Sequence, residues 1–147
     1  MKGWGMGSLV GDGTRSVAAL LIDYLASAGV EYVFGVAGST IMPLLDGLYA
    51  HSGIEYVPAR YELSAAEMAS GYARTSGRLG VVMTHCGPGV TSCLTSIVSC
   101  SRDGVPLLLI TGNESSETLV RNPYHDWDIL GLLHNPWVGS RRCSSAW

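Results

Sequence analysis

The feature that most constrains the fold is a set of four short apolar segments separated by stretches with helical character. Segments that are apolar on both faces and alternate with helices are typical of a parallel sheet covered on each side. We therefore expect an α/β fold with an open parallel sheet and helices on both faces. The four expected strands are YVFGV at 32–36, IEYVPA at 54–59, LGVVMT at 79–84 and PLLLITG at 106–112.

The stretches around these strands contain the expected helices. Ser16 can cap a first helix that runs to about residue 28, and Gly29 can end it. Further helices are expected within 38–53, over 63–75, over 89–104 and, by spacing alone, in 127–133. On the first helix, apolar spacing assigns five residues to the core face: Val17, Leu20, Leu21, Tyr24 and Leu25.

Composition limits the class of protein. A chain of 147 residues, of which 47% are hydrophobic and 14% charged, is long enough for one domain with a sizeable core. The net charge of −3 and the lack of a basic cluster give no reason to expect nucleic acid or an anionic membrane as a partner. Residues 1–15 are glycine-rich and are expected to be a flexible leader, without the apolar core of a signal peptide. No apolar run is long enough to span a bilayer, so we expect a cytoplasmic protein.

The four cysteines indicate neither a metal centre nor a disulfide framework. Cys86, Cys93, Cys100 and Cys143 form no CxxC pair and lack the spacings typical of zinc sites. Cys93 and Cys100 fall in an apolar helical segment, where buried free thiols are ordinary packing residues. We therefore expect no metal ligands in this chain.

Polar residues follow the expected strands at the edge where ligands of such sheets bind. Right-handed crossovers place the carboxyl ends of all parallel strands at one edge, and ligands of open α/β sheets bind just beyond it. The loops at that edge carry Ser39, Glu62, Thr84, His85 and Gly87. We therefore expect these five residues to converge, although they are far apart in the sequence.

Three of these side chains also have simpler interpretations. Glu62 stands where a strand ends and a helix begins, so its carboxylate can serve only to cap or favour the helix start. His85 could be a general acid or base, but a lone histidine beside a turn is also commonly structural. Ser39 could equally cap the helix that follows it.

The glycine-rich turns favour close contact with a flat ligand over the binding of nucleotide phosphates. In GPG at 87–89 the glycines have no Cβ and the proline fixes its own φ, so the backbone can approach a ligand closely. GVAGS at 35–39 lacks both the dinucleotide fingerprint and the Walker A lysine. GDG at 11–13 lies in the leader with no strand before it, and we reject it as a metal-diphosphate anchor.

Three longer stretches resemble a known domain. GVEYVFGVAGSTIMPLLDGL, RYELSAAEMASGYARTSGRLGVVMTHCGPGVTSCLT and RDGVPLLLITGN are similar to the N-terminal pyrimidine-binding (PYR) domain of thiamin-diphosphate-dependent enzymes. The enzymes in question form the acetolactate synthase, pyruvate decarboxylase and benzoylformate decarboxylase group. The similarity covers about residues 16 to 133, with several separate motifs in the family's own order. It implies the thiamin-diphosphate-binding fold of PYR type.

The resemblance implies a role for Glu62. In the family, the glutamate after the second strand hydrogen-bonds N1′ of the cofactor's aminopyrimidine and promotes the imino tautomer that takes the proton from thiazolium C2. The cofactor then serves as the electron sink when a 2-keto acid reacts. A carboxyl in a dry site can share a proton with a ring nitrogen more favourably than in water. Glu62 is therefore the expected catalytic and cofactor-binding residue.

Further positions match the family motif, and some depart from it. Gly87, Pro88 and Gly89 match the GPG turn beside the pyrimidine, and Thr84 ends the strand that leads into it. Ser39 matches a serine near the substrate in benzoylformate decarboxylase-like members, and His125 matches a glutamine near the substrate in synthase-like members. His85 is a candidate catalytic residue, although synthase-like members usually have a small polar residue there. Two more departures are Ala37 in place of a proline and Ser92 in place of an asparagine.

The resemblance also implies parts that this sequence does not supply. Family members hold the diphosphate through Mg²⁺ on a second domain, usually from another chain, with a GDG motif and a later asparagine. Residues 16–147 are expected to form a PYR domain that lacks its last strand, either as a fragment of a longer enzyme or as a separate subunit. We expect half of a decarboxylase or carboligase site, completed in a homodimer or by a diphosphate-binding subunit. The alternative is a non-catalytic PYR-domain relic with a binding or regulatory role.

Overall fold

The centre of the protein is a sheet of four parallel strands. The computed structural model describes residues 15–113, 128–134 and 139. The strands are ordered β2-β1-β3-β4, and every neighbouring pair is parallel. This sheet confirms the α/β fold with an open parallel sheet. The strands are β1 (Tyr32–Gly35), β2 (Glu55–Pro58), β3 (Gly80–Thr84) and β4 (Leu107–Thr111).

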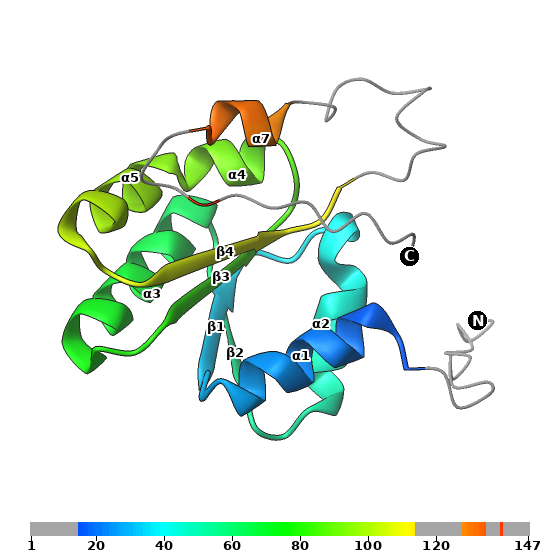
Figure 1. The fold of residues 1–147 in the computed structure, drawn as a ribbon. Helices are drawn as coiled ribbons and strands as arrows, with labels where there is room; N and C mark the ends of the chain where they lie inside the picture. The colour runs from blue at the N-terminus through cyan, green and yellow to red at the C-terminus, as the bar shows by residue number, and fades with distance from the viewer. Residues whose placement is uncertain (1–14, 114–127, 135–138, 140–147) are drawn as a thin grey trace.

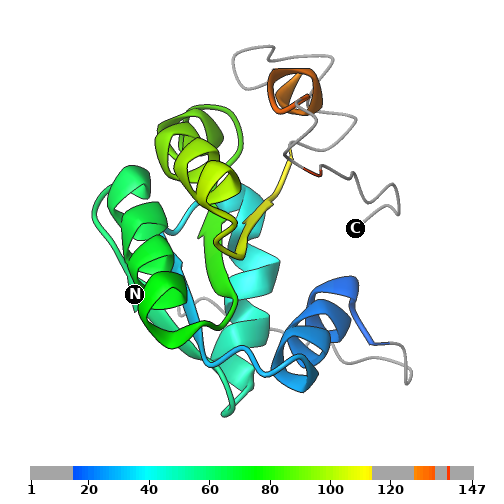
Figure 2. The ribbon, with the colours of Figure 1, turned by 60° about the vertical axis from the view of Figure 1, so that its left-hand side comes forward.

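Helices cover both faces of the sheet (Figure 1). The helices α1 (Val17–Ser27) and α2 (Met42–Ala50) lie on one face, and α3 (Glu62–Ser76) and α5 (Leu94–Asp103) lie on the other. Figure 2 shows the two pairs on opposite sides of the strands. Three shorter helices complete the described part of the chain: η1 (Ser39–Ile41), α4 (Pro88–Ser92) and α7 (Ile129–Leu132).

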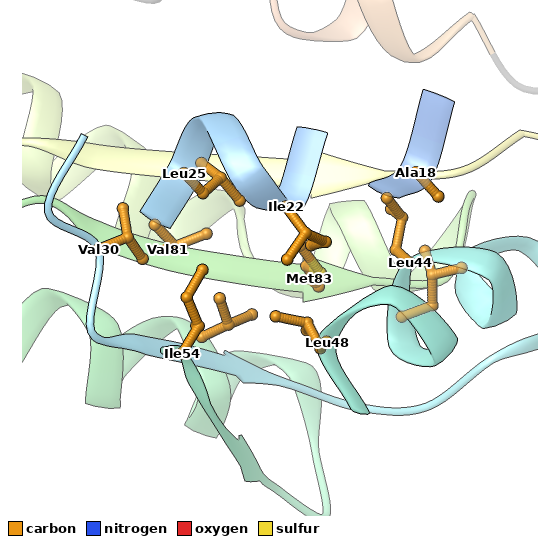
Figure 3. Close-up of a cluster of buried hydrophobic side chains, with 11 residues drawn as sticks. Ala18, Ile22, Leu25, Val30, Leu44, Leu48, Ile54, Val81 and Met83 are labelled. Atoms are coloured by element: carbon orange, nitrogen blue, oxygen red, sulfur yellow. The ribbon is translucent and has the colours of Figure 1, made fainter. Parts of the chain in front are cut away.

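The larger of two apolar clusters lies between the sheet and the helices α1 and α2. Figure 3 shows Ile22 and Leu48 from these helices pointing towards Val81 and Met83 of β3. Val81 and Met83 are fully buried. The second cluster lies on the opposite face, where Val82 of β3 packs with alanines of α3. Because alternate residues of β3 enter different clusters, the strand is buried on both faces, as its continuous apolar sequence predicts.

Small residues allow α3 to lie unusually close to the sheet. Ala65, Ala66, Ala69 and Ala73 are buried on its inner face. Gly80, the first residue of β3, lies against this face of α3. A Cβ on Gly80 would overlap the backbone carbonyl of Ala69. This close packing sets the position of α3 relative to β3, and Glu62 is the first residue of that helix.

The expected core face of α1 is partly wrong. Ser16 is the N-cap residue as expected, and its hydroxyl accepts a hydrogen bond from the Ala19 amide at 3.1 Å. Leu20 and Tyr24, however, are 48% and 70% exposed. The segment is apolar around much of its circumference, so spacing alone did not identify the inner face. The buried residues are Ala18, Ile22 and Leu25.

The single helix expected over 89–104 is instead two helices, interrupted at Cys93. This residue ends α4 and precedes α5. The hydroxyls of Thr91 and Ser92 donate to the carbonyl of Pro88, at 3.1 and 2.8 Å. Such bonds compete with regular backbone pairing and bend helices. Both α4 and α5 contact α3.

The order of the strands creates a switch point between β1 and β3. From β1 the chain crosses to β2 on one side and later returns to form β3 on the other side. The connections that leave the carboxyl ends of β1 and β3 therefore run in opposite directions. Open α/β sheets bind their ligands in the crevice at such a point.

Candidate functional site

Glu62 is the first residue of α3 and lies just beyond the carboxyl end of β2. Tyr61, not Glu62, occupies the N-cap position, so Glu62 is not the capping residue of this helix. Its carboxylate in the first turn still benefits from the positive end of the helix dipole. The side chain is half-buried. An acid is thus held at the ligand-binding edge with part of its surface accessible.

Glu62, Thr84 and Gly89 lie together although they come from three different segments. A Cβ placed on Gly89 would lie 3.7 Å from Glu62 Oε1 and 3.4 Å from Thr84 Oγ1. Gly89 is buried, and Thr84 has no exposed surface. The hydroxyl of Thr84 has no hydrogen-bond partner among the described residues. A buried hydroxyl of this kind is costly unless a ligand or water meets it.

The GPG turn at 87–89 places its backbone beside Glu62 and Thr84. Gly87 has φ +62° and ψ −115°, a conformation that side chains strongly disfavour, so glycine is required there. Pro88 is exposed and begins α4, where its missing N–H costs nothing. Gly89 follows Pro88. The side of Gly89 on which a Cβ would stand faces Thr84 and Glu62, so the absence of a Cβ leaves space between these residues.

Cys93 packs behind Glu62, a contact that sequence reasoning missed. Its thiol donates to the backbone carbonyl of Glu62 at 3.5 Å, and the residue is completely buried. Burial, with an additional contribution from the Glu62 charge, raises the pKa of the Cys93 thiol to about 12. Cys93 is therefore a neutral packing residue, as the sequence indicates, and it also supports the first turn of α3.

A second group of residues joins the loops after β1 and β3. The His85 Nδ1 and Thr40 Oγ1 atoms are 2.8 Å apart, and the Cys86 amide donates to the same oxygen at 3.4 Å. Gly38 lies against the His85 ring, because a Cβ on Gly38 would come within 2.7 Å of His85 Cβ. Sequence reasoning found His85 but not Thr40, which had no motif to single it out.

The remaining expected site residues are less closely tied to these groups. Ser39 is exposed and begins η1; Gly38 is the N-cap of η1 and Ile41 that of α2, so Ser39 caps neither helix. His125 lies outside the described residues.

Within the described ranges, no three His, Cys, Asp or Glu side chains are grouped as metal ligands. No helix in the described part of the chain is long and apolar enough to cross a membrane.

Two open hollows lie at the opposite, amino-terminal edge of the sheet. They measure about 520 and 650 Å³ and share Glu31 and Gly53 in their walls. Their linings contain none of the residues expected to form the site. These two hollows are therefore separate from the carboxyl edge, where Glu62 and the Thr84 hydroxyl lie.

Comparison with known proteins identifies the family. The profile of the thiamine pyrophosphate enzyme, N-terminal TPP binding domain, matches residues 15–132. The chain belongs to the thiamine pyrophosphate enzyme family. The expected resemblance to its N-terminal domain is thereby confirmed, and residues 15–132 include both groups of residues described above.

The curated relatives in this family are much longer. An acetolactate synthase large subunit from Haemophilus influenzae is 36% identical over 117 residues, which are 80% of this chain and 20% of that protein. The large subunit of Escherichia coli acetolactate synthase isozyme 2 is 37% identical over 115 residues, 78% of this chain and 21% of that protein. The chain thus spans about a fifth of the length of the relatives it matches.

The residues at the edge fit the pyrimidine end of thiamin diphosphate (thiamine pyrophosphate). An aminopyrimidine is a flat ring with a basic nitrogen and an amino group. A half-buried carboxylate, a buried hydroxyl without a partner and a backbone face without a Cβ supply matching contacts for such a ring.

Proposed function

We propose that this chain supplies the pyrimidine-binding half of a thiamin-diphosphate-dependent active site that acts on a 2-keto acid, as a decarboxylase or a carboligase. The single observation that carries this proposal is the meeting of Glu62 with Thr84 and Gly89 at the carboxyl edge of the sheet. Its location in a domain of this family supports the same conclusion.

Glu62 has the central role in this proposal. Its carboxyl group would hold a proton at N1′ of the aminopyrimidine when the cofactor is bound. The bound cofactor supplies the carbanion chemistry and the electron sink for the keto acid. Glu62 stands in the first turn of α3, where the helix dipole favours a carboxylate.

Thr84, Gly87, Pro88 and Gly89 bind the cofactor in this proposal. The hydroxyl of Thr84 gains the partner that it lacks among the described residues. The glycines bring backbone against the ring, and Pro88 makes the turn rigid. We assign His85 and Ser39 to the substrate side of the site, because both lie on the loops that flank the switch point. His125 remains a proposed substrate contact from sequence similarity.

The proposed site is one half of a complete site. Glu62 is half-buried, so part of its surface is open to a second surface that closes over it. We propose that a diphosphate-binding domain holds Mg²⁺ and that it comes from a longer chain, a homodimer partner or a separate subunit. Residues 16–147 then form the PYR domain of a cytoplasmic assembly.

The experiment that tests the proposal is Glu62→Gln in the cofactor-loaded species that contains this sequence. We expect turnover of the 2-keto acid to fall by about 10²- to 10⁴-fold, the usual contribution of a positioned proton-transfer group. Turnover is measured with saturating thiamin diphosphate and Mg²⁺, so that weaker cofactor binding does not account for the loss.

Glu55→Gln is the matched control, because Glu55 begins β2, at the end of the strand opposite to Glu62, and is exposed. We expect this variant to retain turnover. Unchanged turnover in Glu62→Gln would contradict the proposal. The isolated 147-residue chain is expected to decarboxylate little or no keto acid, since the metal clamp and the closed pocket come from elsewhere.

A further inference from the structure

The turn between α2 and β2 is built against the ring of His51. His51 is the C-cap residue of α2, and Ser52 and Gly53 lie in the turn that precedes β2. The Gly53 amide donates a hydrogen bond to His51 Nδ1 at 3.1 Å. Gly53 lies so close to the ring that a Cβ on it would come within 2.8 Å of His51 Cε1. A change at Nδ1 therefore acts directly on the turn.

The hydrogen bond from Gly53 determines the charge of His51 in this structure. A backbone amide can only donate, so Nδ1 must be unprotonated to accept from it. A ring with an unprotonated Nδ1 is neutral and has its proton on Nε2. The observed turn is consequently the turn of the neutral histidine.

A carboxylate faces the other ring nitrogen. His51 Nε2 is 3.8 Å from Oδ1 of Asp23 in α1, which is too long for a hydrogen bond but close for two opposite charges. His51 also stands at the carboxyl end of α2, where the helix dipole favours a positive charge. The His51 side chain is 27% exposed, so protons from solvent can reach it. A protonated ring would thus gain an ion pair in place of the bond from Gly53.

The other charged groups around the turn leave these surroundings acidic. Arg15 pairs with Asp23, so it competes with a protonated His51 for that carboxylate. The hollow of about 650 Å³ beside the turn has two further acids in its wall together with His51. These acids are Glu31, which pairs with Arg78, and Glu55, and the wall also contains two tyrosines, Tyr32 and Tyr49.

We propose that His51 is a pH-sensitive switch of the turn between α2 and β2. In the neutral form, Nδ1 accepts from the Gly53 amide and holds the turn as observed. When a proton from solvent binds Nδ1, two donors face each other, so the bond from Gly53 breaks and the ring pairs with Asp23. Gly53 is part of the walls of both hollows at the amino-terminal edge, so its release alters the surface there. The inference does not depend on the proposed function, which concerns the opposite edge.

The first test is NMR of the full 147-residue chain between about pH 8 and pH 5, the range in which histidine side chains titrate. At the upper end we expect Nδ1 of His51 to have the ¹⁵N shift of an unprotonated nitrogen and Nε2 that of a protonated one. As the pH falls, the Gly53 amide should lose its hydrogen-bonded shift on the same curve as the His51 ring signals. A Gly53 amide that does not follow this curve, or a proton on Nδ1 at the upper end, would overturn the proposal.

Two histidine variants separate this effect from other titrating groups. Glutamine has no titrating proton, so in His51→Gln the Gly53 amide should no longer change between about pH 8 and pH 5. His134→Gln is the matched control, because His134 follows α7 and is exposed. This variant should keep the wild-type change at Gly53. Persistence of the change in His51→Gln, or its loss in His134→Gln, would contradict the assignment to His51.

The second test measures the role of Asp23 by a double-mutant cycle. Asp23→Asn and His51→Gln, singly and combined, are unfolded with urea at about pH 5 and at about pH 8. Their effects on stability should be non-additive at the lower pH, where the ring is charged, and additive at the higher pH, where it is neutral. The same coupling at both pH values would show that Asp23 does not hold the protonated ring, and it would overturn the proposed switch.

Discussion

Cys93 connects the charge of Glu62 to the pH dependence of folding. Its thiol pKa is raised from 9.0 to about 12, chiefly by burial and further by Glu62. The folded thiol therefore keeps its proton to a higher pH than the unfolded thiol. Above pH 9 the native state binds more protons, so the stability that this thiol contributes is complete below about pH 9 and is lost as pH rises towards about 12.

This dependence can be isolated by urea unfolding of the wild type and Cys93→Ala between pH 8 and pH 11. The wild type should lose stability more steeply above pH 9 than Cys93→Ala does. Equal slopes in the wild type and Cys93→Ala would show that the thiol is not shielded as the structure indicates.

At the scale of whole elements, the close packing of α3 against β3 can be tested by its effect on stability. Gly80→Ala places a methyl group against the Ala69 carbonyl, and because both are backbone positions the helix must move. We expect a loss of about 1–3 kcal/mol in the free energy of unfolding. Gly71→Ala on the same helix meets nothing within 4 Å and should instead add about 0.5–1 kcal/mol. The measurement is urea unfolding of both variants.

The same two variants also test the site. A shift of α3 moves Glu62, so Gly80→Ala should weaken cofactor binding as well as stability. If Gly80→Ala were as stable as the wild type, the close packing that positions Glu62 would be wrong. Gly71→Ala is expected to leave cofactor binding unchanged, because it faces solvent.

The elements were predictable where apolar runs were unambiguous. The ends of all four strands were predicted to within one residue, because each strand is short, apolar and bounded by helical stretches. The inner face of α1 was not predictable, because its sequence is apolar around most of the helix. The interruption at Cys93 was not predicted, because the Thr91 and Ser92 hydroxyls bond to the Pro88 carbonyl, and spacing alone does not indicate such local side-chain bonds.

For the molecule as a whole, motifs in the sequence predicted the acid and the turn of the candidate site but not its internal contacts. Glu62 and the GPG turn were expected at one edge, and Thr84 and Gly89 do lie beside Glu62. The contact between Thr40 and His85 joins residues 45 apart in sequence and depends on which strands are neighbours. Periodicity and spacing contain no signal for such a contact, so only the folded chain reveals it.

The central claim is that Glu62, Thr84 and Gly89 recognise the pyrimidine end of thiamin diphosphate. Amide NMR of the full 147-residue chain, titrated with millimolar thiamin diphosphate, tests it most directly. We predict shifts at the amides of these three residues and their loss in Glu62→Gln. No shift at the carboxyl edge, or shifts confined to Glu31 and Gly53 at the opposite edge, would contradict the claim.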